Sequence, residues 1–238
     1  MRTNPKLMVM ATMLLGLAAC KKNNLNGIHS PASVNVVNAM PTSNPLVAFF
    51  GKGPVEYYST SVNLYYGTNL LFTPPVDSGN LTIRPITDTT FTIFQGKMDL
   101  VPGGIYSLFL AGDTTKPDTM WVKEEMPYYR DSVSGIRFVN LTQGGKAISI
   151  NLVGNDPNSQ MEFSSLTYRN ITPFKKYPVN SPWNGVYYFY EIRDQGSGSL
   201  LGTYIWADYI FKTRTVVLAG STDPTSNVPF TFFTVNNF

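Results

Sequence analysis

Few residues of this sequence have side chains that could act as nucleophiles, bases or metal ligands. The chain of 238 residues holds one histidine, His29, and one cysteine, Cys20. A Ser-His-Asp or Cys-His arrangement needs a histidine beside its nucleophile, and zinc and copper sites draw on several His or Cys ligands. His29 stands nine residues after Cys20, outside the apolar segments. We therefore predict no catalytic residues, no metal site and no cofactor.

Carboxylates are the remaining candidates, either for a glycosidase pair or for a calcium site. Glu124 and Glu125 stand together at the end of a predicted strand, where like charges usually mark a solvated edge. The loop 154–159 offers oxygen ligands but lacks the spaced acids of an EF-hand loop, so we interpret it as a turn. No motif places two acids on one face, and we predict that the chain is not an enzyme.

Cys20 has a different chemistry, which the residues before it indicate. Two basic residues precede an apolar stretch over residues 7–19, which is too short to cross a bilayer as a helix and typical of a signal peptide. The stretch ends in leucine and two alanines directly before Cys20, which resembles a lipobox. We predict that residues 1–19 are a lipoprotein signal peptide and that lipid on Cys20 anchors the mature chain to a membrane. The alternative is a buried helix that happens to end in cysteine.

Cleavage at this site changes the charge of the chain. Loss of Arg2 and Lys6 takes Lys plus Arg from 18 to 16, against 15 Asp plus Glu. No basic stripe remains, so we expect no nucleic-acid partner. Residues 20–32 are polar and aperiodic, which predicts a lipidated tether. Lys21, in place of an Asp after the cysteine, resembles routing to the outer membrane of a Gram-negative bacterium.

Aromatic residues make up 13% of the chain, and many stand next to each other. Neighbours on a strand point to opposite faces, so one of Tyr187 and Tyr188 should face away from the core. Trp183 stands in a segment rich in Ser, Pro, Asn and Gly, which favours the surface. We predict Trp183, Tyr187 and Tyr188 as ligand-binding candidates that stack on a sugar or anchor a protein. The alternative is that such tyrosines fill half-buried positions of a β-protein or the space between facing repeats.

The elements that must position these residues are short and β-like. No stretch keeps helical spacing over three turns, and turn clusters such as 195–198 separate the apolar runs. Strand-like composition is clear at 81–83, 91–93, 148–150 and 232–235. This pattern predicts an all-β fold made of immunoglobulin-like antiparallel β-sandwiches.

The chain also repeats itself at a distance of about one small domain. Three blocks recur in the same order: 33–38 at 135–140, 64–67 at 166–169, and 106–112 at 214–220. A period near 100 residues is too long for a solenoid and is the size of one immunoglobulin-like sandwich. We predict two tandem domains, β-sandwich repeat 1 at residues 33–130 and β-sandwich repeat 2 at residues 135–238.

These repeated blocks resemble the bacterial domain-of-unknown-function family 4397 (DUF4397). The block 34–41 is similar to the family's opening valines, alanine and proline, and 101–112 is similar to its glycine, tyrosine and final leucine-x-glycine element. The likeness also runs through 47–51 and 64–67. The second copy departs from the pattern, because no proline follows Leu141 and residues 212–214 replace the Gly-Gly-x-Tyr stretch. The resemblance implies a cell-envelope β-sandwich of unassigned activity and brings no catalytic residues.

Two functions remain open from these observations. The first is a non-catalytic binding or adhesion module on a lipid-anchored envelope protein, with a glycan or a protein as its partner. The alternative is a carbohydrate-binding accessory lipoprotein of a glycan-uptake system, with Trp183 and Tyr187 on the contact surface. The two differ in whether aromatic side chains gather on one exposed patch.

Overall fold

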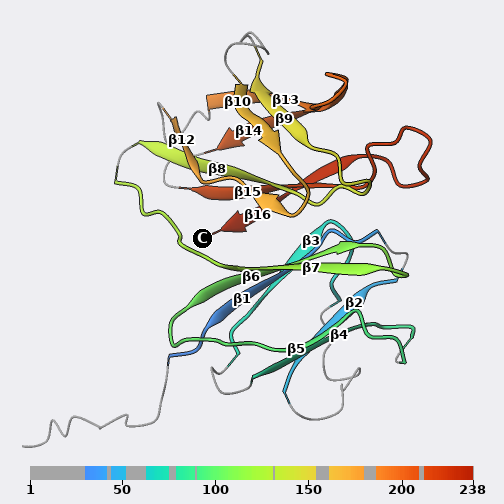
Figure 1. The fold of residues 1–238 in the computed structure, drawn as a ribbon. Helices are drawn as coiled ribbons and strands as arrows, with labels where there is room; N and C mark the ends of the chain where they lie inside the picture. Colours follow the sequence, from blue (N-terminus) through green and yellow to red (C-terminus); the bar gives the residue numbers. More distant parts are fainter. Residues whose placement is uncertain are drawn as a thin grey trace, which may run out of the picture.

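The computed structural model describes residues 30–41, 44–51, 63–74, 79–88, 90–130, 132–153, 161–179, 186–208 and 212–237. Strands joined by turns and loops make up this part of the chain, which confirms the prediction of an all-β fold (Figure 1). Among the same residues, no helix has the length and apolar character needed to cross a membrane.

The first seven strands form two sheets, which we call the first outer and the first inner sheet. The first outer sheet has the order β2 (Leu46–Phe50), β4 (Asn80–Pro85) and β5 (Phe94–Lys97). The first inner sheet has the order β3 (Thr68–Phe72), β1 (Ser33–Asn38), β6 (Ile105–Gly112) and β7 (Pro117–Lys123).

The remaining strands form a second inner and a second outer sheet. The second inner sheet has the order β11 (Asn170–Ile171), β8 (Val133–Asn140), β15 (Thr213–Ala219) and β16 (Thr231–Asn237), and β12 (Lys175–Pro178) also pairs with β8. The second outer sheet has the order β10 (Met161–Leu166), β9 (Ile148–Leu152), β13 (Val186–Asp194) and β14 (Leu200–Asp208).

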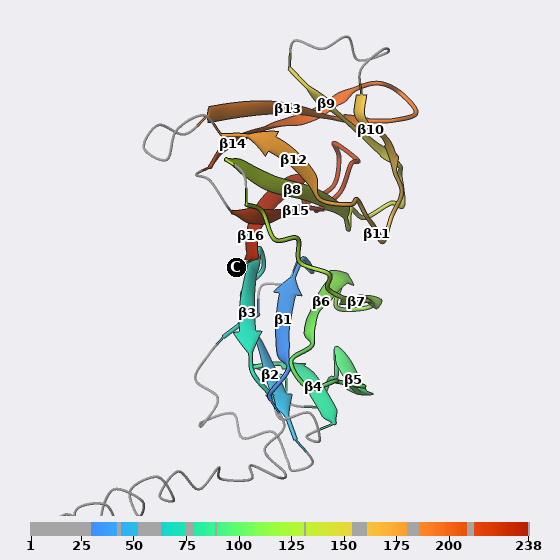
Figure 2. The same ribbon diagram turned by 90° about the vertical axis from the view of Figure 1, so that its left-hand side faces the viewer.

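The four sheets stack as layers, with the two inner sheets face to face in the middle (Figures 1 and 2). A separate apolar cluster fills each interface. Leu46, Leu81 and Leu108 belong to the cluster within the first half, and Phe138 and Tyr190 to the cluster within the second half. The third cluster, which we call the junction, joins the two inner sheets through Val37, Phe109, Val139, Val217 and Val235.

Both faces of each inner sheet are therefore covered. On β1, Val34 and Val36 face the first cluster while Val37 faces the junction. Successive side chains of a strand point to opposite faces, so a strand with two covered faces carries a nearly continuous apolar run. This explains why β1, β6, β8 and β15 are buried along almost their whole length.

Each inner sheet contains one parallel pair, which the sequence-based expectation of antiparallel sandwiches did not include. β1 runs parallel to β6, and β8 runs parallel to β15. Parallel neighbours need a long crossover connection. Strands β2 to β5 lie between β1 and β6 in sequence, and β9 to β14 lie between β8 and β15, so the crossovers include the outer sheets.

The repeated blocks occupy matching places in the two halves. Asn38 Nδ2 donates to the carbonyl oxygen of Leu64 over 3.3 Å, and Asn140 Nδ2 donates to that of Leu166 over 2.8 Å. The Oδ1 atoms of the two asparagines each accept a hydrogen bond of 3.0 Å from the backbone N–H two residues later. The division at 33–130 and 135–238 stays a prediction, and we propose it on these matching hydrogen bonds together with the matching inner-sheet topology.

One strand-like segment of the sequence is not a strand. Segments 81–83, 148–150 and 232–235 lie within β4, β9 and β16, whereas 91–93 lies before β5. The reason is local turn chemistry, because Asp88 Oδ1 accepts hydrogen bonds from the backbone N–H groups of Thr90 and Phe91. Such a turn holds the chain away from a strand ladder, and pairing resumes only at Phe94.

Candidate binding surface

The sequence-predicted site residues fall into two groups. Cys20, in the predicted lipobox, and Trp183, in the predicted surface loop, lie outside the described residues. Tyr187 and Tyr188 lie on β13, the central strand of the second outer sheet that pairs with both β9 and β14. The structure therefore places two of the three ring candidates and the strand that carries them.

Tyr187 and Tyr188 point to opposite faces of β13. Tyr188 packs inward, where its ring stacks on that of Trp206 with centroids 5.3 Å apart and 28° between the planes. Its hydroxyl donates to the carbonyl oxygen of Pro178 over 2.6 Å. Tyr187 faces outward and has 64% of its surface exposed. We therefore assign Tyr188 to the core and keep Tyr187 as the contact candidate.

Many of the other tyrosines of the second half are also part of the core. Tyr177 and Tyr190 lie with their rings nearly perpendicular and 5.8 Å apart, and Tyr190 stacks near Tyr204 at 6.2 Å. Burial raises the pKa of Tyr177 and that of Tyr190 far above the ordinary value of tyrosine, since water no longer solvates the phenolate. Both groups stay protonated at physiological pH and pack in the core, and the Tyr177 hydroxyl donates to Glu162 Oε2 over 3.0 Å.

Two further apolar side chains share the outward face with Tyr187. Phe189 is 42% exposed and Ile205 is 56% exposed. The two are direct cross-strand partners of β13 and β14, and side chains so paired lie about 5 Å apart at Cβ. Tyr187, Phe189 and Ile205, which we call the outer patch, form an exposed apolar surface near one edge of the second outer sheet.

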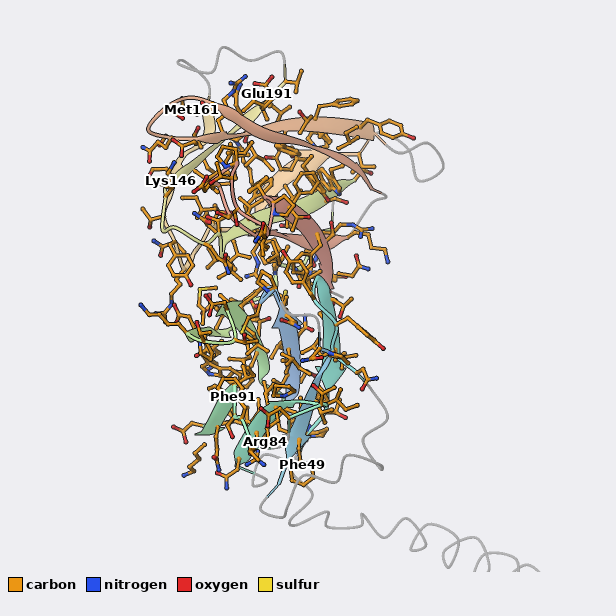
Figure 3. The ribbon with its side chains drawn as sticks, turned by 90° about the vertical axis from the view of Figure 1, so that its right-hand side faces the viewer. Phe49, Arg84, Phe91, Lys146, Met161 and Glu191 are labelled. Atoms are coloured by element: carbon orange, nitrogen blue, oxygen red, sulfur yellow. The ribbon has the colours of Figure 1, made fainter. Side chains whose placement is uncertain are left out.

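A polar pair continues the same face along β13. Arg193 donates through Nε and Nη2 to Glu191 Oε2, at 3.2 and 3.0 Å. Figure 3 shows Glu191 and Met161 at the end of the molecule farthest from Phe49, Arg84 and Phe91, which belong to the first half. The outer patch thus lies on a sheet face at one end of the stack, with charged groups beside it.

Phe189 and Ile205 were not among the residues predicted from the sequence, although a signal for Phe189 was present. Glu191 and Arg193 alternate with Ile192 on the same strand, and two charged side chains with that spacing indicate the solvated face. Tyr187 and Phe189 have the same parity as Glu191 and Arg193, so they had to share that face. Ile205 could be placed only with the strand register, which the sequence does not supply.

The structure also bears on the carboxylates that the sequence offered. Among them, no three His, Cys, Asp or Glu side chains gather in the way a metal ion requires. Glu124, which we expected at a solvated edge, is buried in the junction, so that expectation is wrong for this residue. Arg137 binds its carboxylate through two hydrogen bonds of 2.7 Å each and donates through Nε to Thr215 over 2.8 Å. This carboxylate is fully occupied by a structural ion pair.

No protein-family model matches the chain, and no curated protein matches it. Among solved structures, the CBMbc module (family CBM26) of Eubacterium rectale Amy13K, in complex with maltoheptaose, is similar over 85% of this chain and 95% of that chain. The sequence identity is 9% and the TM-score is 0.26. Likeness at this level establishes neither a common fold nor a common ligand, and the resemblance to DUF4397 stays an interpretation of the sequence.

Proposed function

We propose that this chain is a lipid-anchored cell-envelope protein whose folded part is a non-catalytic binding module. The observation that carries this proposal is the outer patch, in which Tyr187, Phe189 and Ile205 expose apolar surface side by side. Scattered exposed apolar residues are ordinary, but a contiguous group rimmed by polar side chains is typical of an interaction site. The anchor rests on the sequence around Cys20 alone.

A glycan is the partner that this surface favours. Exposed tyrosine and phenylalanine rings on a sheet face offer surfaces on which a sugar ring can stack, and a phenol hydroxyl adds a hydrogen bond. The ion pair of Glu191 and Arg193 continues the same face and supplies further polar groups to hydroxyls. Trp183, four residues before Tyr187, is the ring that sequence analysis adds to this region. The carbohydrate-binding accessory lipoprotein of a glycan-uptake system is the corresponding specific role.

The direct test is a glycan array with the detergent-solubilised lipoprotein, followed by Tyr187→Ala and Phe189→Ala. Each substitution should weaken binding to the retained glycan at least about tenfold, because central aromatic contacts dominate such interfaces. Tyr128→Ala is the matched control, since Tyr128 is 84% exposed but lies in the first half after β7. Equal binding by all three variants, each shown to be folded, would remove the outer patch as the contact surface.

The anchor has its own test, independent of any ligand. Cys20→Ala should prevent acylation and leave the protein uncleaved or free of the membrane fraction. Two or more acyl chains, at roughly 0.8 kcal/mol per buried methylene, hold a protein stably on a bilayer. Mass spectrometry of the mature N-terminus measures the modification, and wild-type protein found wholly in the soluble fraction would contradict the anchor.

A further inference from the structure

A second concave site lies where the two halves meet. A cleft of about 470 Å³ opens between residues 112–113 and 116–118 of the first half and residues 142–145 and Tyr168 of the second. Its walls are the turn from β6 to β7 and the chain after β8, which end on the same side of the molecule (Figure 1). Ligand pockets commonly have volumes of about 300–1,000 Å³ and favour such boundaries between packed units.

Hydrogen bonds hold the two walls of this cleft together. Gln143 Nε2 donates to the carbonyl oxygen of Gly112 over 3.1 Å, and the Tyr168 hydroxyl donates to Asp118 Oδ2 over 3.1 Å. Arg169 adds a contact of 3.3 Å to Asp118 and a hydrogen bond of 2.8 Å to the carbonyl oxygen of Thr119. The cleft is therefore formed before any ligand arrives, and binding need not order its walls.

Two carboxylates and one ammonium group line the cleft, and Arg169, just outside the lining, balances the remaining negative charge. Asp118 pairs with Arg169, and Asp113 Oδ1 accepts hydrogen bonds from the backbone N–H groups of Thr115 and Lys116. Lys116 contributes a positive charge beside these two carboxylates. A lining of this kind attracts neither a polyanion nor a cation strongly, but it offers donors and acceptors in many directions.

Part of the lining, which we call the floor, consists of Gly144 and Gly145 and has no side chains of its own. Gly144 and Gly145 have φ values of +93° and +67°, which glycine adopts without strain. A Cβ on Gly145 would meet no described atom within 4 Å. A ligand can therefore approach the backbone of this segment closely.

We propose that this cleft is a binding site for a neutral carbohydrate unit, held by hydrogen bonds to side chains of both halves. Sugars carry many hydroxyl groups and no charge, which matches a polar lining of balanced charge. The site is distinct from the outer patch, which lies on the second outer sheet, so it can bind whether or not the outer patch does.

The test is an NMR titration of the detergent-solubilised lipoprotein with maltose, cellobiose and lactose at millimolar concentration. Glucuronate and glucosamine serve as charged comparisons. At least one neutral disaccharide should shift the amide resonances of Asp118 and Gly145 together and saturably, because the ligand touches both walls. Tyr187→Ala is the matched control and should leave this affinity unchanged.

Two substitutions probe the cleft without removing its cross-wall bonds. Asp113→Asn keeps an Oδ1 acceptor for its own turn and should weaken binding roughly 2- to 10-fold, as expected for one altered hydrogen bond. Gly145→Asn adds a side chain to the open floor at a φ that asparagine tolerates, and it should reduce binding further. Unchanged melting temperatures confirm that both variants are folded.

Three results would overturn the proposal. The first is that no neutral disaccharide shifts residues on both walls, and the second is that only glucuronate or glucosamine does so. The third is a binding constant that neither substitution changes. Shifts confined to Tyr187 and Phe189 would also reject the cleft while they support the outer patch, so the two sites fail separately.

Discussion

The central strands of the inner sheets and the edge strand β10 of the second outer sheet meet water very differently. Seven of the eight residues of β8 are buried, whereas β10 has a single buried residue, Leu166. The inner sheets have an apolar layer on each side, and the outer sheets have one apolar layer and one free face. The difference teaches that the central strands of the inner sheets hold the layers together, while the contact surfaces that we propose lie on an outer face and at the rim of the junction.

Polar groups follow the same division. In the inner sheets, polar side chains that water cannot reach have protein partners, as buried polar groups generally must. Asn35 Oδ1 accepts from Asn69 Nδ2 over 2.8 Å, and Thr215 Oγ1 accepts from both Arg137 and Asn237. On the outer face of β13, by contrast, the ion pair of Glu191 and Arg193 stays partly exposed to solvent.

The largest expected effect concerns the two arginine–glutamate pairs, one buried between the inner sheets and one on an outer face. Arg137→Ala should lower the free energy of unfolding by about 3–5 kcal/mol, because it leaves the buried Glu124 carboxylate without a partner. Arg193→Ala should cost at most about 1 kcal/mol, because its pair with Glu191 is partly exposed. Urea denaturation of the two variants measures the difference.

A double change controls for the loss of charge itself. Glu124→Leu with Arg137→Met replaces the pair by apolar side chains, and it should recover most of the stability, since a buried pair often contributes little beyond apolar packing. Equal losses for Arg137→Ala and Arg193→Ala would show that Glu124 remains solvated and that the junction is open.

A smaller effect is expected at two exposed turns, those that contain Asp113 and Asp223. The pKa of Asp113 is lowered by hydrogen bonds from the Thr115 hydroxyl and from the backbone N–H groups of Lys116 and Thr115. The pKa of Asp223 is lowered by hydrogen bonds from the backbone N–H and the hydroxyl of Thr225. A carboxyl whose pKa is lower in the folded state stabilises the fold above its unfolded pKa. That contribution is lost as the pH falls through the folded pKa.

Side-chain NMR titration should therefore give both aspartates pKa values below the ordinary 3.8. Thr115→Val should move the pKa of Asp113 back toward that value, because the hydrogen bond from the threonine hydroxyl contributes most to the lowering of this pKa. The pKa of Asp223 should not change in this variant. A value of Asp113 that stays low after Thr115→Val would assign the effect to the backbone alone.

The central strands of the inner sheets could be predicted from the sequence because each is a short apolar block that occurs twice in the chain. The blocks 33–38 and 135–140 became β1 and β8, and 106–112 and 214–220 lie in or beside β6 and β15. Each block has apolar residues at both odd and even positions and occurs twice. It can therefore be recognised in the sequence without knowledge of the strands that pair with it. The parallel pairing within each inner sheet was not predictable in this way, because strand order depends on how the outer sheet crosses over.

The proposed binding surface was harder to predict, for the opposite reason. Tyr187 and Tyr188 are chemically alike, and only the parity that Tyr188 shares with Ile192 indicates that it turns inward, where it stacks on Trp206. Glu124 looked like a solvated acid because its partner, Arg137, belongs to the facing layer. Residues whose role depends on a contact between layers cannot be placed from strand periodicity alone.

The position of β1 has a mechanical consequence. β1 lies between β3 and β6 and is hydrogen-bonded to both along its length. Any pull on the chain before Ser33, directed along the strand, loads the hydrogen bonds on both sides at once, instead of opening them one after another as at a free edge. Because forced unfolding depends on the rate of the first rupture, a protein held by its N-terminal end gains resistance to tension from the placement of its first strand.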